Sequence, residues 1–473
     1  YFFDMANIRE HCSWVHSKQK EEATQKAKDI VRMSVARTIH LEPLQEFELP
    51  VNPAALVVGG GVAGMTSALS LANQGFEVHL VEKAKDLGGM ARRIQTTLEG
   101  LDVQAYVSDL IRLVYQHPLV HVSHEATITD VSGFVGSFVT TVKSEGQVKT
   151  IRHGATILAT GSDEHKPTEY LYGADDRVWT QLELEERIAR GDERLPSVRG
   201  VVMIQCVGCR QEGHNYCARV CCSQAVKNAL ELKRHNPGID IYILFRDMRT
   251  YGFKEDYYRE AAEKGVVFVR WEPDSKPEVE VTQDEEGRPI LRVTVPDPIL
   301  GARLAIDADL VVLSAAVVPS ASNAEVARLF KVSVSPDGFF QEAHVKLRPV
   351  DFAVEGVFMC GANHYPKHLG ETISQAYGAA GRAVTILSQD TVTASGSVCE
   401  VGPHDCVSCG ACLTACAYGA IHWCETPAGK KAEVNPVLCK GDGLCCAKCP
   451  TGAIALKHFT DEEVFNQIDA ALS

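Results

Sequence analysis

The distribution of cysteine limits what this chain can fold into more than any other feature of the sequence. Seventeen cysteines occur in 473 residues, five of them between Cys206 and Cys222 and most of the others between Cys399 and Cys449. A disulfide framework would spread its cysteines over a small secreted domain. Thiolates gathered in a long chain instead indicate metal binding, most often iron–sulfur clusters, and a reducing, cytoplasmic compartment.

The cysteines of the tail form an internal repeat. The run from Cys406 to Cys416 recurs from Cys439 to Cys449, with the spacing of a two-cluster ferredoxin, where the last cysteine of each run binds the other cluster. The ligands expected for the first cluster are Cys406, Cys409, Cys412 and Cys449. Those expected for the second are Cys416, Cys439 and Cys445, with Asp442 where the repeat requires a cysteine.

Asp442 leaves three readings of the second cluster open. Its carboxylate is an oxygen ligand, or the cluster lacks one iron, or Cys446 completes it despite the awkward geometry next to Cys445. The three cysteines that fit no spacing, Cys360, Cys399 and Cys424, are expected to be core thiols.

A glycine-rich turn near the start of the chain lies within a complete βαβ pattern. The apolar run 54–58 predicts a buried strand of a parallel sheet, and it leads into a GxGxxG turn that begins at Gly59. A helix over 65–74 and a second strand ending in Glu82 follow. This arrangement is typical of a dinucleotide site.

Each residue of that pattern has a physical role. Gly59 permits the tight turn, Gly61 lets the backbone approach a pyrophosphate at the helix N-terminus, and Gly64 allows the helix to pack closely on the strand. Glu82 can accept hydrogen bonds from both ribose hydroxyls and would repel a 2′-phosphate. The alternative is a glycine-rich turn without a ligand.

The segments that follow resemble the FAD domain of two-dinucleotide-domain flavoproteins of the thioredoxin reductase class. They are a second glycine pair in 87–90, the strand end 159–161 and the strand-to-loop segment 358–363. By this resemblance Gly361, Ala362 and Asn363 approach the flavin pyrophosphate and ribityl chain. The FAD-binding residues implied are Gly59, Gly61, Val62, Ala63, Gly64, Glu82, Lys83, Gly89, Met90, Ala126, Ala159, Thr160, Gly161, Gly361, Ala362, Asn363 and Lys367. Lys367 would place a positive charge near the reduced flavin; the alternative is a surface lysine.

The second βαβ pattern has cysteines where such flavoproteins carry a second glycine turn. The predicted strand 200–204 runs into Cys206 and Cys209, and Cys217, Cys221 and Cys222 follow. We therefore expect a metal cluster, either iron–sulfur or zinc, in place of a nicotinamide nucleotide. A redox-active dithiol of Cys206 and Cys209, or buried inert thiols, remain alternatives.

The residues 205–210, 216–222 and 245–252 together resemble the A-type subunits of heterodisulfide reductase and their bacterial relatives, and so do 10–16 and 366–372. The resemblance covers essentially the entire chain. It implies FAD, several [4Fe–4S] clusters, and a place in a larger complex that performs flavin-based electron bifurcation or confurcation. The partners implied are B- and C-type subunits, a hydrogenase- or dehydrogenase-linked subunit that supplies electrons, ferredoxin, and a second copy of the chain.

The resemblance also assigns individual cysteines. The middle cluster maps to Cys206, Cys217, Cys221 and Cys222, with Cys209 as an extra thiol. Cys12 resembles a ligand of an N-terminal cluster whose other ligands would precede Tyr1, so we expect a longer protein. Archaeal members insert a ferredoxin domain after a segment like 131–136; here the chain continues directly.

The fold expected is α/β, a thioredoxin-reductase-like flavoprotein with a C-terminal α+β two-cluster ferredoxin domain. We expect a helical arm over 1–50, an FAD domain over 51–168 and 305–392, an inserted cluster-bearing domain over 169–304, and the ferredoxin domain over 393–473. No acid, base or nucleophile that would activate a substrate is evident, which suits a protein that distributes electrons.

Composition excludes several other classes of protein. The net charge is −14 and no basic cluster occurs, so a nucleic-acid partner is not expected. No apolar run reaches the length of a membrane span.

Three rival functions remain: an NAD(P)H-dependent disulfide reductase that uses Cys206 and Cys209, a quinone- or benzoyl-CoA-pathway relative of the same build, and a non-catalytic scaffold that carries clusters.

Overall fold

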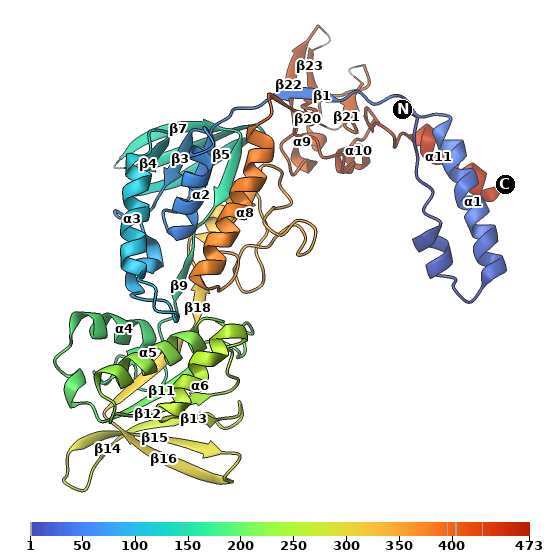
Figure 1. The fold of residues 1–473 in the computed structure, drawn as a ribbon. Coiled ribbons are helices and arrows are strands. Elements are labelled where there is room, and N and C mark those ends of the chain that lie inside the picture. Colours follow the sequence, from blue (N-terminus) through green and yellow to red (C-terminus); the bar gives the residue numbers. More distant parts are fainter. Residues whose placement is uncertain (1, 145, 395, 403, 428) are drawn as a thin grey trace. The chain divides into compact units, whose positions relative to one another are not determined.

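The computed structural model describes residues 2–144, 146–394, 396–402, 404–427 and 429–473. It divides into two compact units (Figure 1). One is Val51–Gln389, and the other joins the residues up to Pro50 with Asp390–Ser473. The N-terminal arm and the cysteine-rich tail therefore form one unit, although they stand at opposite ends of the sequence.

The first part of Val51–Gln389 is built on a five-stranded parallel sheet. The strand order is β19-β8-β2-β3-β4, and every neighbouring pair runs parallel. The strands are β2 (Ala55–Val58), β3 (Val78–Val81), β4 (Val120–Ser123), β8 (Ala155–Leu158) and β19 (Val357–Met359). Every residue of β2 is buried, because this central strand is covered on both faces.

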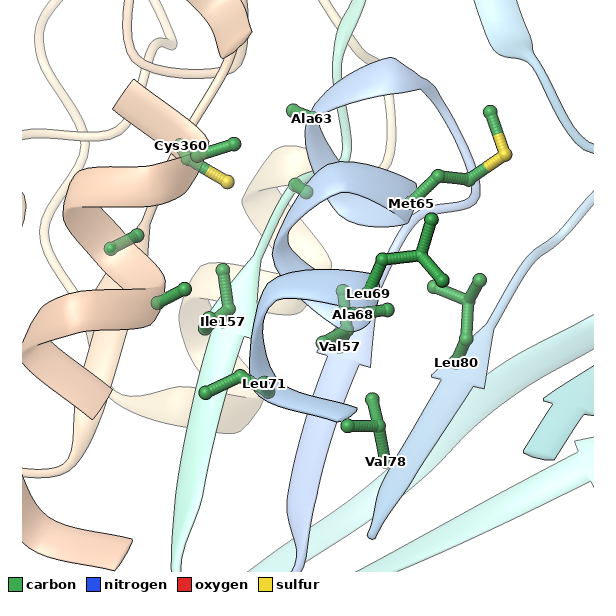
Figure 2. Packing of buried hydrophobic residues seen from close by; sticks show 14 of the residues in the cluster. Val57, Ala63, Met65, Ala68, Leu69, Leu71, Val78, Leu80, Ile157 and Cys360 are labelled. Atoms are coloured by element: carbon green, nitrogen blue, oxygen red, sulfur yellow. The ribbon is translucent and has the colours of Figure 1, made fainter. Parts of the chain in front are cut away.

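Helices cover one face of this sheet, and an antiparallel sheet and a helix cover the other. Val57, Leu80 and Ile157 pack under the helices (Figure 2), whereas Leu56 packs with the antiparallel strands. The helices of the first face are α2 (Val62–Ala72), α3 (Val103–Gln116) and α8 (Leu369–Leu387). The elements of the second face are β5 (Ala126–Phe134), β6 (Ser137–Ser144), β7 (Gln147–His153) and α7 (Asn323–Phe330).

The middle of this unit is a second parallel sheet with helices. Its strand order is β10-β17-β11-β12-β13. The strands are β10 (Val178–Thr180), β11 (Gly200–Val207), β12 (Asp240–Phe245), β13 (Val266–Arg270) and β17 (Leu310–Ala315). The helices are α4 (Gln181–Arg190), α5 (Cys221–His235) and α6 (Glu255–Glu263), with short turns at Leu195–Ser197 and Gly252–Lys254. An antiparallel sheet of β14 (Glu278–Gln283), β15 (Pro289–Asp297) and β16 (Ala302–Ala308) completes it. Two Rossmann-like sheets in one unit confirm the α/β class.

Two short strands connect the parts of Val51–Gln389 that contain the two parallel sheets. β9 (Ser162–Glu164) pairs antiparallel with β18 (Val317–Pro319), and these strands carry the chain out of the first sheet and back to it (Figure 1). The boundary expected at residue 305 differs from this, because it falls inside β16 and β17 still belongs to the middle sheet. The apolar run of β17 predicts a buried parallel strand but not the sheet that it joins.

The second unit contains two helices that lie together and a small module of short strands. α1 (Lys20–Thr38) packs along α11 (Asp461–Leu472), and a short helix, Arg9–Trp14, precedes α1. Arg37 ties the arm to the tail: its guanidinium lies over Phe459 at 4.4 Å and hydrogen-bonds to the His458 carbonyl. β1 (Phe47–Pro50) pairs antiparallel with β20 (Thr391–Ala394).

The tail module follows the cysteine repeat. Two short helices, α9 (Ala411–Ala415) and α10 (Leu444–Lys448), each follow a left-handed glycine, Gly410 and Gly443. The strand pairs are β21 (Cys399–Val401) with β24 (Ile454–Leu456), and β22 (Ile421–Thr426) with β23 (Gly429–Val434). Equivalent turns at equivalent repeat positions give the module the pseudo-symmetry expected of a ferredoxin-like domain. No described helix combines the length and apolarity that crossing a bilayer requires.

Candidate functional site

The glycine turn between β2 and α2 is tightly packed on one side and open on the other. A Cβ on Gly59, which has φ +111°, would lie 2.2 Å from the Ala159 carbonyl oxygen, and one on Gly64 would lie 1.8 Å from the Gly59 oxygen. A Cβ on Gly61 would meet no atom within 4 Å. Gly59 and Gly64 are therefore required by packing, whereas Gly61 faces free space at the N-terminus of α2.

Three segments distant in sequence converge on this turn. Gly89 opens a short helix, Gly89–Arg93, and its virtual Cβ lies 3.3 Å from Gly61 Cα. Gly361 approaches Ala63 closely enough that an added Cβ would lie 2.8 Å from the alanine methyl carbon. Ala159 borders Gly59, and Gly161 has open space at its own Cβ position. Figure 2 shows the start of α2, with Ala63, beside the segment that carries Cys360.

Glu82 ends β3 and turns its carboxylate toward the turn. It accepts hydrogen bonds from Gly60 N at 2.5 Å and Ala84 N at 2.7 Å and is 8% exposed. Ala126 N donates to the Glu82 carbonyl. The exposed Lys83 reaches Ser320 Oγ at 3.1 Å, and Thr160 donates to Asn323 Oδ1 at 2.7 Å. Ser320 and Asn323 were not predicted from the sequence, because no spacing links them to the turn.

The loop after β19 adds buried polar groups. Asn363 is fully buried; its Nδ2 donates to the Leu158 carbonyl, while its Oδ1 has no hydrogen-bond partner in the described part of the chain. Lys367 Nζ is buried and donates to the Gly361 carbonyl and to Gln375 Oε1, each at 2.7 Å. Burial lowers the pKa of Lys367 to about 7. The surface-lysine alternative is therefore wrong, and Gln375 joins the set of residues that the sequence did not reveal.

These features fit a dinucleotide. A Cβ added to Gly61 or Gly161 would meet no atom within 4 Å. A phosphate group could therefore come close to the backbone at these two glycines without a steric clash. The free Asn363 oxygen is a buried acceptor that a ligand donor would satisfy. Val62 and Ala63 begin α2, Met90 is half-buried beside Gly89, and Ala362 is half-buried beside Gly361.

The middle sheet presents cysteines at the corresponding turn. β11 ends at Val207, and α5 begins with Cys221 and Cys222 in its first turn. Four buried thiols gather in this turn, those of Cys206, Cys209, Cys221 and Cys222. Cys217 is half-buried and its Sγ accepts from Arg219 N at 3.3 Å. The structure thus adds Cys209 to the thiols near Cys206, and leaves Cys217 at the edge of the group.

Positive charge surrounds these thiols. Arg210 Nη1 lies 3.9 Å from Cys206 Sγ, and the same guanidinium pairs with Asp247 at 2.5 Å. A hydrogen bond from Cys209, with help from Arg210 and against the effect of burial, lowers the pKa of Cys206 to about 6. Thiolates are the form that binds metals and also the form that attacks disulfides, so the charge suits both candidate chemistries.

The first half of the tail repeat surrounds a cavity. A small cavity is lined by Cys406, Cys409, Cys412 and Cys449, together with Trp423 and apolar residues. Three of these cysteines come from the first run and Cys449 from the second. The four cysteines line one space, and a set of four thiols fits a thiolate-bound cluster.

The second half of the repeat gathers a different set. Cys399 Sγ lies 3.5 Å from Cys445 Sγ and 3.8 Å from Cys446 Sγ. The Cys399 backbone N lies 3.4 Å from Cys439 Sγ. Asp442 is exposed, and its Oδ1 accepts from Leu444 N at 3.2 Å. Cys399 is buried, as expected of a core thiol, but it also lies among the thiols of the second run. The sequence did not indicate this placement, because Cys399 lies outside the repeat.

Cys12 and Cys416 complete the predicted ligands. Cys12 is buried in Arg9–Trp14, and within the described ranges it belongs to no group of three close metal-ligating side chains. Cys416 is half-buried at the end of α9, and its Sγ accepts from Ala420 N at 3.4 Å.

Comparison with known proteins places these sites in a family. Residues 57–119 match a family model described as an NAD(P)-binding Rossmann-like domain. The second A-type iron-sulfur subunit of the CoB–CoM heterodisulfide reductase of Methanopyrus kandleri is 36% identical over 564 aligned positions, which cover 100% of this chain and 85% of the relative. The A-type subunit of the H(2):CoB-CoM heterodisulfide,ferredoxin reductase of Methanothermobacter marburgensis is 33% identical over 568 positions, 100% of this chain and 84% of the relative.

One solved structure similar to the chain is the thioredoxin reductase of Lactococcus lactis in its FR conformation. It has a TM-score of 0.49 and 17% identity, and it covers 71% of this chain and 99% of its own. The alignment with the Methanopyrus protein is 564 positions long against 473 residues here, so that relative carries internal residues that this chain lacks. With 36% identity along its whole length, the chain belongs to the family of A-type heterodisulfide reductase subunits and is an oxidoreductase subunit.

Proposed function

We propose that the chain is the FAD- and [4Fe–4S]-containing electron-transfer subunit of a heterodisulfide-reductase-like complex, and that it distributes electrons between partner subunits by flavin-based bifurcation or confurcation. The observation that carries the proposal is the turn between β11 and α5. Cys206, Cys221 and Cys222 occupy the place where a second dinucleotide would need glycines. A relay of single electrons has replaced a site for hydride donors.

The residues around the first turn would hold FAD. The open approach at Gly61 and the N-terminus of α2 suit its pyrophosphate, and Glu82 suits a ribose. Asn363 and Lys367 come from the loop that borders the turn on the other side. Bound FAD would supply chemistry that exchanges electrons in pairs or singly. Lys367, whose pKa burial lowers to about 7, would place a positive charge near the reduced flavin.

The cysteines would hold clusters at four places. Cys206, Cys217, Cys221 and Cys222 are the ligands proposed for the middle domain. Cys406, Cys409, Cys412 and Cys449 share a cavity and are proposed for the first tail cluster. Cys416, Cys439 and Cys445 supply three ligands of the second. Cys12 is proposed as a ligand of a further cluster.

The partners follow from the family. Relatives are named as A-type subunits, which implies further subunits, and one belongs to a heterodisulfide and ferredoxin reductase. We propose B- and C-type subunits, an electron-supplying hydrogenase- or dehydrogenase-linked subunit, ferredoxin and a second copy of the chain as partners, in the cytoplasm. Anaerobic purification of the native complex with identification of its subunits tests this. A complex of quinone- or benzoyl-CoA-linked subunits would replace the proposal with its nearest rival.

Substitution of Gly61 by alanine tests the flavin site specifically. Gly61 has ordinary backbone angles, and its added Cβ meets no protein atom within 4 Å, so Gly61→Ala should fold normally. The methyl group would instead obstruct the close approach of a pyrophosphate, so we expect a loss of FAD affinity of about tenfold or more. The flavin-to-protein ratio after purification measures this.

Gly381→Ala is the matched control. Gly381 lies on α8, and a Cβ there also meets nothing within 4 Å. It should keep its full flavin content. Equal flavin content in the two variants would contradict the assignment of this turn to FAD.

A further inference from the structure

The repeat in the tail leaves the second of its two proposed clusters one thiolate short. Asp442 stands where the repeat requires a cysteine between Cys439 and Cys445. A four-iron cluster needs one ligand for each iron, and a carboxylate is a harder and poorer partner for iron than a thiolate. The fold brings a cysteine from outside the repeat to this place.

Cys399 begins β21, ahead of the first repeat, and faces the second. Its strand pairs antiparallel with β24, with Cys399 opposite Leu456. This pairing sets the Cys399 thiol 3.5 Å from Cys445 Sγ, and the Cys399 backbone N 3.4 Å from Cys439 Sγ. The residue is 2% exposed. It therefore touches two of the three ligands proposed for this cluster and is shielded from solvent.

The arrangement at Cys399 is distinctive in the described part of the chain. Only Cys399, Cys445 and Cys446 there form a group of three metal-ligating side chains whose donor atoms all lie within 4.8 Å of one another. A cysteine that served only as core filling would not need three other thiols around it. Sulfur donors gathered in this way are typical of metal sites.

The two other candidates for the fourth ligand, Asp442 and Cys446, are less suited to bind iron at this place. Asp442 is exposed, and its carboxylate already accepts the Leu444 backbone N–H at the start of α10. Cys446 follows Cys445 directly within α10, and successive helical side chains diverge by about 100°. Cys445 is 5% exposed, whereas Cys446 is half-buried, so Cys445 is the better shielded of two thiols that both lie within 4 Å of Cys399 Sγ.

We propose that Cys399 supplies the fourth thiolate of the second tail cluster, together with Cys416, Cys439 and Cys445, and so replaces the cysteine absent at Asp442. The inference rests on the proposed function, since it presumes that this half of the module holds iron and sulfide. It assigns to β21 a ligand role that the repeat alone does not contain.

Electron paramagnetic resonance of the oxidised full-length protein tests the assignment. An oxidised four-iron cluster gives no signal, whereas a cluster that has lost one iron gives one. The wild type and Asp442→Ala should both be silent. Cys399→Ala, which cannot ligate iron, should show a three-iron signal that integrates to about one spin per chain.

Two further variants make the test specific. Cys424→Ala removes another cysteine outside the repeat, one whose thiol donates to the Glu425 carbonyl, and it should remain silent. The double variant Cys399→Ala with Asp442→Cys returns a thiolate to the repeat position and should abolish the signal again.

The outcomes separate this inference from the proposed function. A wild type that already shows the three-iron signal, or a Cys399→Ala variant that stays silent, would overturn the role of Cys399. Zinc bound in stoichiometric amount and lost on Cys399→Ala would also overturn it. A wild type without iron or flavin would instead overturn the proposed function, and iron and flavin are measured on the same samples.

Discussion

The glycines of the turn between β2 and α2 serve two different purposes. Some allow close packing within the protein, and one leaves space for a ligand. Gly59 and Gly64 are held by contacts with Ala159 and with each other, so their small size serves the packing of α2 on β2. Gly61 has no such contact. Glycine is therefore required for packing at positions 59 and 64 but not at position 61. Only Gly61 identifies where a ligand would approach.

A buried histidine makes the antiparallel sheet of β5, β6 and β7 sensitive to acid. His153 is fully buried between Thr140 Oγ1, 2.8 Å from its Nε2, and the Ala155 carbonyl, 3.1 Å from its Nδ1. Burial lowers the pKa of His153 to about 3, below the ordinary value of 6.5. The unfolded chain binds the proton first as pH falls, so the stability that neutral His153 allows is complete above pH 6.5 and is lost below it.

His153→Gln should reduce this loss. Between pH 7 and 5.5 the wild type should lose about 1 kcal/mol more stability than the variant, because only the wild type has a side chain that must stay neutral there. The thermal unfolding midpoint of each protein at both pH values measures the difference. His11→Gln, at an exposed position, should behave as the wild type does. An equal fall in all three proteins would refute the role of His153.

At the scale of elements, the connection from β11 to α5 carries the chemistry of the middle sheet. Cys206 lies at the end of β11 with φ +64°, and Cys221 and Cys222 open α5. The sequence predicted these elements and their cysteines, because a strand-to-helix turn without glycines is recognisable. It did not predict that Cys209 packs inside the group while Cys217 lies at its edge, since that depends on how the intervening loop folds back.

Paired substitutions of these two cysteines distinguish their roles. We expect Cys217→Ala to lose the middle cluster, and so about four iron atoms per chain, while Cys209→Ala keeps it. Iron content and the visible absorbance of the clusters, both relative to flavin, measure this. Loss of iron in Cys209→Ala alone would exchange the two assignments. Retention in both would favour the dithiol formed by Cys206 and Cys209.

Strand membership shows where sequence patterns stop being informative. The run 310–313 is apolar throughout and would suit a buried strand in either parallel sheet of the larger unit. Its pattern therefore predicted a strand but not the neighbouring strands β10 and β11. Cys399 was missed for a related reason: the pairing of β21 with β24, and not any spacing, brings it to the second repeat. Pairing between distant strands depends on the whole fold.

At the scale of the whole molecule, two Rossmann-like sheets share one unit but only the first has the glycine turn. The isolated, flavin-loaded chain should therefore not take electrons from NADH or NADPH, because the β11–α5 turn gives no pyrophosphate a close approach. Anaerobic absorbance spectra after addition of either nucleotide should show oxidised flavin, and dithionite should then bleach it as the control. Rapid bleaching by NADPH would revive the disulfide reductase rival.

The two ends of the sequence also meet at this scale. α1 and α11 pack together, and Arg37 links the arm to His458 and Phe459. The sequence predicts 1–50 and 393–473 as separate segments, since contacts between chain ends leave no local pattern. The family membership and the α/β class were predictable because they rest on the turn, the cysteine runs and buried strands, which are local.

Pro50 and Thr391 stand opposite each other on β1 and β20, at the two points where the chain passes between units. The larger unit is thus spliced into the smaller one as an uninterrupted insert. A single tight hairpin joining β1 to β20 would close the smaller unit on itself. The cysteine-rich module and its helical arm are therefore one structural unit encoded by two separate stretches of the gene. Both stretches would have to be included if the unit were transferred to another protein.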